Sequence, residues 1–324
     1  MSGKTIIGLL AVLLLVAPAL AQENACGVAQ LEPTHLSRVD AVEDYRSIFR
    51  ICVGPADKKL IALREMKLAG EATLLLADPE TLETVLEKAA CWSCRDAVEA
   101  ELADTRLLRA VNKSAEAPGL TKRGFLQNAG LTHGAGEGAY LTADLCPSSH
   151  PLARNFLEHL APHTPIALSI SGLWLTHHFD DYRWLLDRQA AGAFDIVWTN
   201  HSYHHPFKPG VAFDKNFLLT PGVDADAEIL DTERLLIANG QTPSVFFRFP
   251  GLISDAPLMQ AARRHHLISL GADAWLALQQ KPNTGSIVLV HVNGNEPAGL
   301  KIFERDEISG EMPKPLRKLD EAPM

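Results

Sequence analysis

The chain has 324 residues, of which 47% are hydrophobic and 21% are charged, and this composition excludes a disordered or collagen-like polypeptide. The sequence contains 30 Lys and Arg against 39 Asp and Glu. The resulting net charge of -9 argues against binding to nucleic acid, because such proteins need a basic surface. At roughly 150 residues per domain, the length predicts about two domains, or one barrel-sized domain with an addition.

The first 21 residues have the pattern of a secretory signal peptide. Lys4 precedes a nearly unbroken apolar run over 6–16, and the small residues Ala19 and Ala21 form a signal peptidase pattern before Gln22. The apolar run is shorter than the roughly 20 residues that cross a bilayer, which favours cleavage over a membrane anchor. We therefore expect an exported protein without stable membrane insertion, periplasmic in a Gram-negative host and secreted otherwise.

Residues 22–111 are expected to form a mainly helical region. Tyr45, Ile48, Phe49 and Cys52 follow the spacing i, i+3, i+4, i+7, and the same spacing recurs at positions 82, 85, 86 and 89. Residues 112–137 are rich in glycine and lack periodicity, which is typical of a linker or a covering loop.

From residue 138 to about residue 312, short apolar segments alternate with amphipathic helices, and a polar tail over 313–324 follows. Strands are expected at 139–144, 166–173, 194–199, 245–249, 267–270 and 287–292, and helices at 151–163, 181–191, 225–239 and 258–266. This alternation predicts the α/β class, with a parallel sheet that curls into a (β/α) barrel. The active site of such a barrel lies at the carboxyl ends of its strands. The expected strands end at polar residues: Asp144, Asn200, His201, Arg248, Asp273 and His291.

His201 and His205 are candidate metal ligands. Two histidines four residues apart can present their imidazoles to one divalent cation from one helical turn. Taken alone, the pair is equally compatible with surface or capping histidines, and its position after an apolar strand favours the metal site.

Five motifs in this region resemble those of the NodB-type polysaccharide deacetylases, also called family 4 carbohydrate esterases, over about 138–295. TADLCP at 142–147 is similar to the family's T-F-D-D-G-P, and HSYHHP at 201–206 matches H-[ST]-x-x-H-P completely. RFP at 248–250 matches the third motif, Asp273 with Trp275 the fourth, and LVH at 289–291 the fifth. The resemblance implies a distorted, incomplete (β/α) barrel, and it does not cover the N-terminal third.

The resemblance also implies a reaction, the removal of acetyl groups from a glycan with the help of a divalent metal, for which Zn²⁺ is the expected ion. His201 and His205 would bind the metal, Asp144 would act as base and His291 as general acid. Arg248 would orient Asp144 through a bidentate ion pair, and Asp273 would hold His291. Tyr203, Pro250 and Trp275 lie within the motifs and are expected to contact the acetylated glycan. Neither the glycan nor the choice between N-acetyl and O-acetyl groups follows from the motifs.

The first motif departs from the family at the position of a third metal ligand. The family has a second Asp there, and this chain has Leu145. Cys146 is the most suitable substitute, because a thiolate is a good Zn²⁺ ligand. Two alternatives remain open: Asp144 binds the metal itself, or the barrel binds glycan without metal and without catalysis.

The five cysteines predict two disulfides in an oxidising compartment. Cys26, Cys52, Cys91 and Cys94 can pair in three ways, and Cys146 is then the free thiol. Cys91 and Cys94 have C-x-x-C spacing, but they lack the preceding strand of a thioredoxin-like redox motif, so we expect a structural role for them.

Overall fold

The computed structural model describes residues 26–28, 33–116, 119–122 and 124–323. Its centre is a parallel sheet of seven strands in the order β13-β11-β10-β9-β8-β15-β14. The strands are β8 (Tyr140–Leu145), β9 (Thr164–Ile170), β10 (Phe194–Asn200), β11 (Phe246–Phe247), β13 (Ile268–Ser269), β14 (Ala274–Trp275) and β15 (Ile287–His291). No pairing joins the edge strands β13 and β14 within the described residues, so the curled sheet is a distorted, incomplete (β/α) barrel, as the sequence predicts.

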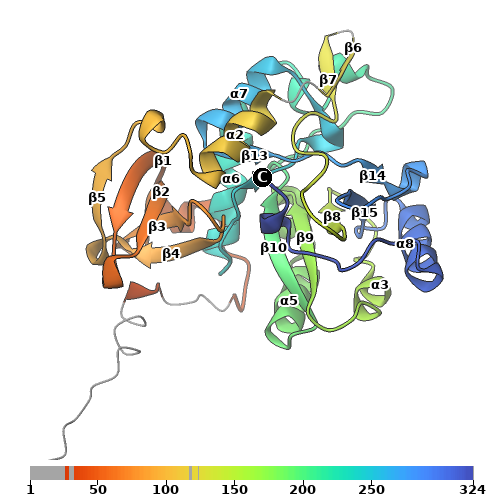
Figure 1. Ribbon diagram of the computed structural model, residues 1–324, viewed down its shortest axis with the longest axis horizontal. Helices are drawn as coiled ribbons and strands as arrows, with labels where there is room; N and C mark the ends of the chain where they lie inside the picture. Colours follow the sequence, from red (N-terminus) through yellow and green to blue (C-terminus); the bar gives the residue numbers. More distant parts are fainter. Residues whose placement is uncertain (1–25, 29–32, 117–118, 123, 324) are drawn as a thin grey trace, which may run out of the picture.

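Helices accompany this sheet in the expected alternation (Figure 1). They are α3 (Arg154–Glu158), α4 (Gly172–His177), α5 (Phe179–Ala190), α6 (Ala225–Ala238), α7 (Ala256–Arg264) and α8 (Pro297–Ser309). The four predicted helices correspond to α3, α5, α6 and α7, whereas α4, α8 and the two-residue strand β14 were not expected. None of the helices in the described part of the chain is long and apolar enough to cross a membrane.

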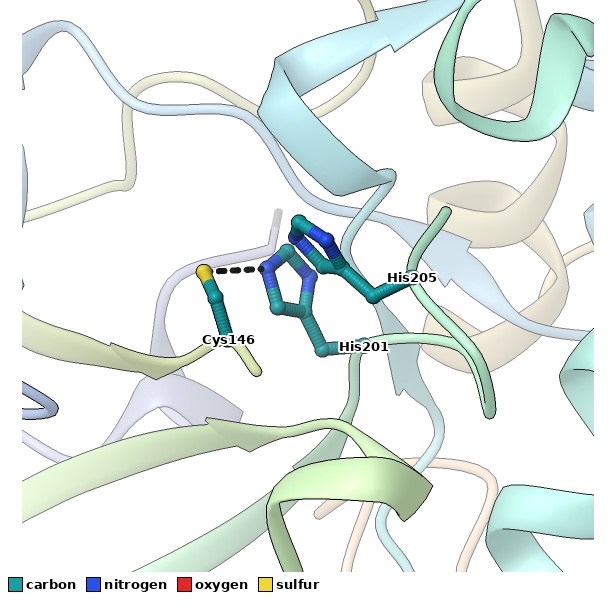
Figure 2. A group of neighbouring side chains, drawn as sticks. All are labelled: Cys146, His201 and His205. Atoms are coloured by element: carbon teal, nitrogen blue, oxygen red, sulfur yellow. Dashed lines mark hydrogen bonds between the residues drawn. The ribbon is translucent and has the colours of Figure 1, made fainter. Parts of the chain in front are cut away.

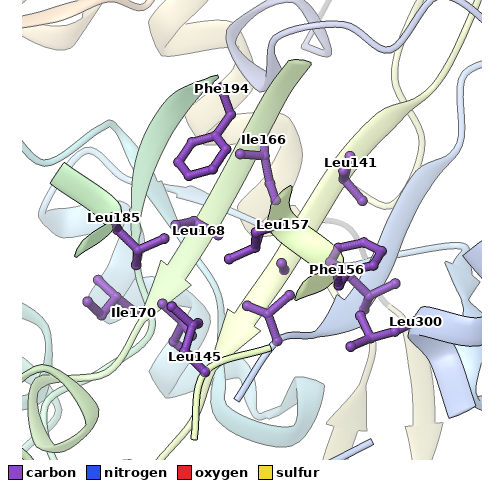
Figure 3. Packing of buried hydrophobic residues seen from close by; sticks show 14 of the residues in the cluster. Leu141, Leu145, Phe156, Leu157, Ile166, Leu168, Ile170, Leu185, Phe194 and Leu300 are labelled. Carbon is purple, nitrogen blue, oxygen red and sulfur yellow. The ribbon is translucent and has the colours of Figure 1, made fainter. Parts of the chain in front are cut away.

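The core of the barrel forms where apolar residues of the strands meet the helices. Leu141, Leu145, Leu168 and Ile170 from β8 and β9 pack with residues such as Leu157 of α3 (Figure 3). Leu145 is completely buried in this cluster. Because successive side chains of a strand point to opposite faces, the residues on either side of Leu145 face away from this core.

The prediction of a mainly helical region over residues 22–111 is wrong. The chain there forms an antiparallel sheet in the order β4-β3-β2-β1-β5, which lies beside the barrel (Figure 1). Its strands are β1 (Val42–Val53), β2 (Lys59–Leu68), β3 (Glu71–Ala77), β4 (Thr84–Lys88) and β5 (Ser93–Asp96), and one helix, α2 (Arg106–Glu116), follows. The pairing of β1 with β2 shifts register twice, between Glu43 and Arg46 and between Ser47 and Arg50. Each extra residue interrupts the alternation of a strand, so the apolar residues of β1 imitate a helical spacing.

Two other parts of the chain also differ from expectation. The segment 112–137 contains the end of α2 and a hairpin of β6 (Leu120–Lys122) and β7 (Phe125–Gln127), which pairs with β12 (Ile253–Ser254). The polar tail predicted over 313–324 is wrong for its described residues, because Leu319 and Ala322 are buried against the barrel. Short 3-10 helices also occur in the described part of the chain: η1 (Val39–Ala41), η2 (Pro55–Asp57), η3 (Ala89–Cys91), η4 (Glu99–Glu101), η5 (Phe213–Lys215), η6 (Phe217–Leu219), η7 (Pro250–Leu252), η8 (Leu276–Leu278) and η9 (Leu319–Glu321).

The predicted use of the cysteines is confirmed. Cys26 pairs with Cys91, Cys52 pairs with Cys94, and Cys146 is free and buried. The two cysteines of the C-x-x-C sequence thus bond to different partners rather than to each other, which agrees with a structural role. The predicted signal segment, residues 1–21, lies outside the described residues.

Candidate metal centre and active site

Strand β8 supplies two ionisable residues at its carboxyl end. Asp144 is its penultimate residue and Cys146 follows its last, and both are buried. The two-residue period of the strand places them on the same face, opposite to Leu145, whose side chain enters the core (Figure 3). The position that carries an Asp in the family motif therefore faces the interior here, and the neighbouring thiol faces the site.

Strand β10 ends at Asn200, and the loop that follows carries His201 and His205. This loop has no helical turn, so the predicted reason for the two imidazoles to meet is wrong. Instead, Ser202 and His205 adopt left-handed backbone conformations with φ of 65° and 46°, and the Ser202 hydroxyl accepts a hydrogen bond from the His205 N–H at 3.1 Å. This fold of the loop brings the two rings to a centroid distance of 4.7 Å.

His204 points away from the pair. Its side chain is 63% exposed, and its ring Nδ1 lies 2.7 Å from a carboxylate oxygen of Glu228 in α6. The backbone N–H of His204 donates to the other oxygen of the same carboxylate at 2.9 Å. Glu228, which the sequence did not single out, thus fixes the middle of the histidine loop.

Cys146, His201 and His205 converge on one point (Figure 2). Their ligand atoms all lie within 4.8 Å of one another, and Cys146 Sγ lies 3.5 Å from His201 Nε2. The Nδ1 of His201 lies 2.8 Å from the carbonyl of Arg248, so this nitrogen donates its proton there and Nε2 faces the centre. His205 Nε2 is buried and has no hydrogen-bond partner among the described residues. Two imidazoles and a thiol are ligands that suit Zn²⁺.

Asp144 lies next to this group and is held by Arg248. The Nη1 of Arg248 donates to Asp144 Oδ1 at 2.7 Å and to the Thr142 hydroxyl at 2.9 Å, while its Nη2 donates to the Gly271 carbonyl. The ion pair is therefore formed through one nitrogen, not in the expected bidentate manner. Burial raises the pKa of Asp144, but the charges of Arg248 and His201 outweigh it and lower the pKa to about 2.

His291 at the end of β15 completes the group from the other side. Its Nε2 lies 4.0 Å from Asp144 Oδ2, and one of its ring nitrogens lies within 4.8 Å of Cys146 Sγ. Its Nδ1 forms an ion pair with Glu296 Oε2 at 2.8 Å, and the Trp275 indole donates a hydrogen bond to the same oxygen at 2.8 Å. Burial lowers the pKa of His291, but Cys146, Glu296 and Asp144 raise it well above its ordinary value.

The prediction that Asp273 holds His291 is wrong. Asp273 accepts hydrogen bonds from Ser286 and the Ile287 N–H, and its carboxylate lies 2.7 Å from His133. Glu296, located in the loop before α8, takes the place at His291. No sequence motif predicts the contact between Glu296 and His291, and the only signal is that the two residues lie five positions apart.

The residues expected to contact substrate differ in their surroundings. The Trp275 indole is partly exposed and stacks on His291 at a centroid distance of 5.8 Å. Tyr203 is half-buried and packs against the main core cluster. Pro250 is buried at the start of η7, so its side chain lies inside the protein.

Burial raises the pKa of the Cys146 thiol, but the surrounding histidines outweigh burial. His205, His201 and His291 together lower the pKa of Cys146 well below its ordinary value. A thiol in this environment exists readily as the thiolate, which is the form that binds metals.

No protein-family profile matches this sequence. Among solved structures, the chain is similar to a family 4 carbohydrate esterase from Bacillus anthracis, with 20% identity, 60% of this chain and 87% of that chain covered, and a TM-score of 0.42. PdaA of Bacillus subtilis, a family 4 carbohydrate esterase, has 15% identity, coverage of 71% and 90%, and a TM-score of 0.42. A pseudoenzyme of the same family from Bacillus anthracis has 14% identity, coverage of 55% and 63%, and a TM-score of 0.38. Each of these proteins belongs to the family that the five motifs resemble.

Proposed function

We propose that this chain is an exported, metal-dependent hydrolase that removes acetyl groups from an N-acetylated glycan. The observation that supports this most is the convergence of three metal-ligand side chains with Asp144 and His291 at the ends of three barrel strands. A ligand group with a separate base and acid beside it is what metal-assisted hydrolysis requires. The same groups would also serve an O-acetyl ester.

Cys146, His201 and His205 would hold the metal, and Zn²⁺ fits this donor set best. The unpartnered Nε2 of buried His205 supports the fit, because a buried imidazole nitrogen normally has a partner. A divalent cation bound there would polarise the acetyl carbonyl and acidify a water molecule.

Asp144 and His291 would move the protons. The carboxylate of Asp144 accepts the proton of the attacking water, and Arg248 keeps it ionised and oriented for this purpose. His291 donates a proton to the departing amine nitrogen, which leaves as the free amine of the sugar while acetate is released. Glu296 stabilises the protonated form of His291 and fixes its ring.

The two disulfides support export, since disulfides persist in oxidising compartments and are rare in the cytosol. In a Gram-negative host the protein would act in the periplasm, and otherwise outside the cell.

A second candidate function is glycan binding without catalysis. The observation that favours it is Leu145, which occupies the position of a family metal ligand and is buried in the core. On this alternative the thiol of Cys146 would be an idle buried group.

Metal titration separates the two candidates. Zn²⁺ affinity, measured in competition with a chromophoric chelator, should show one tight site in the wild type. Zn²⁺ binding should be weakened by more than about 100-fold in each of the variants His201→Ala, His205→Ala and Cys146→Ser. Loss of a residue that only supports a ligand typically costs about 10- to 100-fold, so a larger loss identifies the ligands themselves. His204→Ala is the matched control, because this neighbouring imidazole points away, and it should do much less.

Release of acetate from N-acetylglucosamine oligomers should follow metal affinity across the same variants. A correctly folded wild type that binds no divalent cation would contradict the hydrolase and support the glycan-binding candidate. Tight binding that Cys146→Ser leaves unchanged would instead make Asp144 the third ligand.

A further inference from the structure

Contacts between phenylalanine rings join two exposed segments of the barrel into one surface. Phe217 stacks on Phe207 at a centroid distance of 5.2 Å and lies 5.9 Å from Phe213. Phe213 contacts Phe125 of the β6–β7 hairpin at 6.0 Å, and this hairpin projects from the top of the molecule in Figure 1. We call the exposed residues over 120–122 and 207–215 the outer patch.

The outer patch carries a large share of the exposed apolar side chains. Phe207 is 53% exposed, Phe213 is 44% exposed, and Leu120 on the hairpin is 61% exposed. With Val211, they make up four of the seven large hydrophobic residues that are exposed in the described part of the chain. Large apolar side chains gathered on a surface in this way mark an interaction site.

Lysines accompany the apolar side chains of the outer patch. Lys122, Lys208 and Lys215 are exposed, and Asp214 is the one acidic residue over 120–122 and 207–215. Lys122 pairs directly with Phe125 across the hairpin, so their side chains lie on the same face. The outer patch is therefore positively charged, although the chain as a whole has a net charge of -9.

The loop that carries Phe207 and Phe213 is held by a buried side chain. Asn216 accepts a hydrogen bond from the Lys208 N–H at 2.9 Å and donates to the Lys208 carbonyl at 2.8 Å. The same amide donates to the Val211 carbonyl at 3.2 Å, which closes the loop on itself. The exposed side chains are thus fixed in place before any partner arrives, which lowers the entropic cost of binding.

We propose that the outer patch docks the protein on a lipid bilayer with anionic headgroups. The exposed apolar side chains enter the boundary between headgroups and acyl chains, where each gains the free energy of burying apolar surface. The lysines reach the headgroup phosphates, and their methylene stems cover further apolar surface. A protein partner fits less well, because lysine is depleted in protein–protein interfaces.

Docking through the outer patch places the candidate metal centre beside the lipid surface. The buried ring of Phe217, which contacts both exposed rings of the patch, also meets the His205 ring edge-on at a centroid distance of 6.0 Å. One aromatic ring therefore separates the centre from the patch. This inference goes beyond the proposed function and does not depend on the reaction, because the patch contains none of the candidate metal ligands.

Co-sedimentation with lipid vesicles tests the proposal. The experiment uses the chain without its predicted signal segment, since that apolar segment would itself bind lipid. The wild type should bind vesicles of equal parts phosphatidylglycerol and phosphatidylcholine at least about tenfold more tightly than pure phosphatidylcholine vesicles. Phe207→Ala and Phe213→Ala should each weaken binding by about tenfold, the scale of burying part of one ring. Lys208→Gln and Lys215→Gln should each weaken it by about fivefold at low salt.

Two further variants and two controls make the test specific. Asp214→Asn should strengthen binding, because it removes the acidic charge of the outer patch, and Phe207→Trp should retain binding. Ile308→Ala and Lys301→Gln are the matched controls, since both residues are exposed on α8 and lie outside the patch. Neither control should change vesicle binding. Urea denaturation should show wild-type stability for all variants, because each change is at the surface.

Several results would overturn the docking proposal. These are absence of wild-type binding, equal binding to neutral and anionic vesicles, or folded Phe207→Ala and Phe213→Ala variants that bind like the wild type. Loss of N-acetylglucosamine hexamer binding in these variants, without any vesicle binding by the wild type, would assign the patch to glycan instead. Vesicle binding by a protein that binds no Zn²⁺ would keep the docking proposal and contradict the hydrolase.

Discussion

Cys146 Sγ lies 3.5 Å from His201 Nε2, so the thiol next to Leu145 faces the candidate metal centre at the end of β8. The alternation of the strand explains the difference from the family motif. Asp144 and Cys146 share one face, and Leu145 lies on the other among core residues (Figure 3). Adding a carboxylate at position 145 therefore would not restore a metal ligand.

Leu145→Asp should destabilise the protein and leave Zn²⁺ affinity no higher than in the wild type. Loss of a buried leucine together with burial of a carboxyl group should lower the free energy of unfolding by about 3–5 kcal/mol. Urea denaturation measures the free energy of unfolding, and metal titration of the folded protein measures the Zn²⁺ affinity. Leu145→Met, which conserves volume, is the control and should cost less than about 1.5 kcal/mol. Stronger Zn²⁺ binding by Leu145→Asp would show that position 145 reaches the site after all.

Glu296→Gln should narrow the pH range of activity on its alkaline side. In the proposed reaction His291 acts in its protonated form, so activity should fall as pH rises through the pKa of His291. Cys146 and Glu296 both raise that pKa against the effect of burial, and removing the Glu296 charge lowers it. The alkaline limb of kcat/KM should therefore move to lower pH. Glu311→Gln, at an exposed position, is the control. If Glu296→Gln leaves the alkaline limb of the kcat/KM profile unchanged, Glu296 has no role in holding His291.

The barrel and most of the site could be predicted from the sequence because both follow from local pattern. Apolar segments that alternate with amphipathic helices define β8, β9, β10 and β15. The polar residues at the carboxyl ends of β8, β10 and β15 must lie at one edge of a parallel sheet. Asp144, His201 and His291 come together for that reason. The free thiol of Cys146 followed from counting cysteines.

The misses depend on strand pairing and backbone geometry that the spacing of residues in the sequence does not show. The bulges in β1 arise from its pairing with β2, and a window of one strand does not contain that information. Glu296 reaches His291 only because the chain turns back before α8, and Asp273 is drawn to His133 from another segment. The loop of His201 and His205 is shaped by Ser202, rather than by a helical turn.

The N-terminal sheet and the barrel share a buried ion pair whose removal should be costly. Arg64 of β2 donates to both carboxylate oxygens of Glu233 in α6, at 2.7 and 3.0 Å, and Tyr45 donates to the same carboxylate at 2.6 Å. Both charged side chains are almost completely buried. Glu233→Gln leaves the Arg64 charge unpaired and should lower the free energy of unfolding by about 3–5 kcal/mol.

Urea denaturation measures this loss against the exposed pair of Lys67 and Asp44. Lys67→Gln should cost less than about 1 kcal/mol, because solvent screens an exposed pair. Equal effects of the two substitutions would mean that the buried pair does not hold the N-terminal sheet to the barrel.

Asp320 should make the protein less stable as pH rises from about 4 to 7. Burial raises the pKa of Asp320 to about 7, so the native state retains a proton that the unfolded state releases from its ordinary pKa upward. The native state binds more protons in this interval, and the free energy of unfolding therefore falls with rising pH.

Asp320→Asn removes this titration and should be more stable than the wild type between pH 5 and pH 8. The expected gain in the free energy of unfolding is about 1–2 kcal/mol, because solvent partly screens a half-buried group. Urea denaturation at several pH values, with chelator present to exclude metal binding, measures the difference. Asp104→Asn, at an exposed position, is the control. If the free energies of unfolding of the wild type and of Asp320→Asn differ by a constant amount across this pH range, the prediction is wrong.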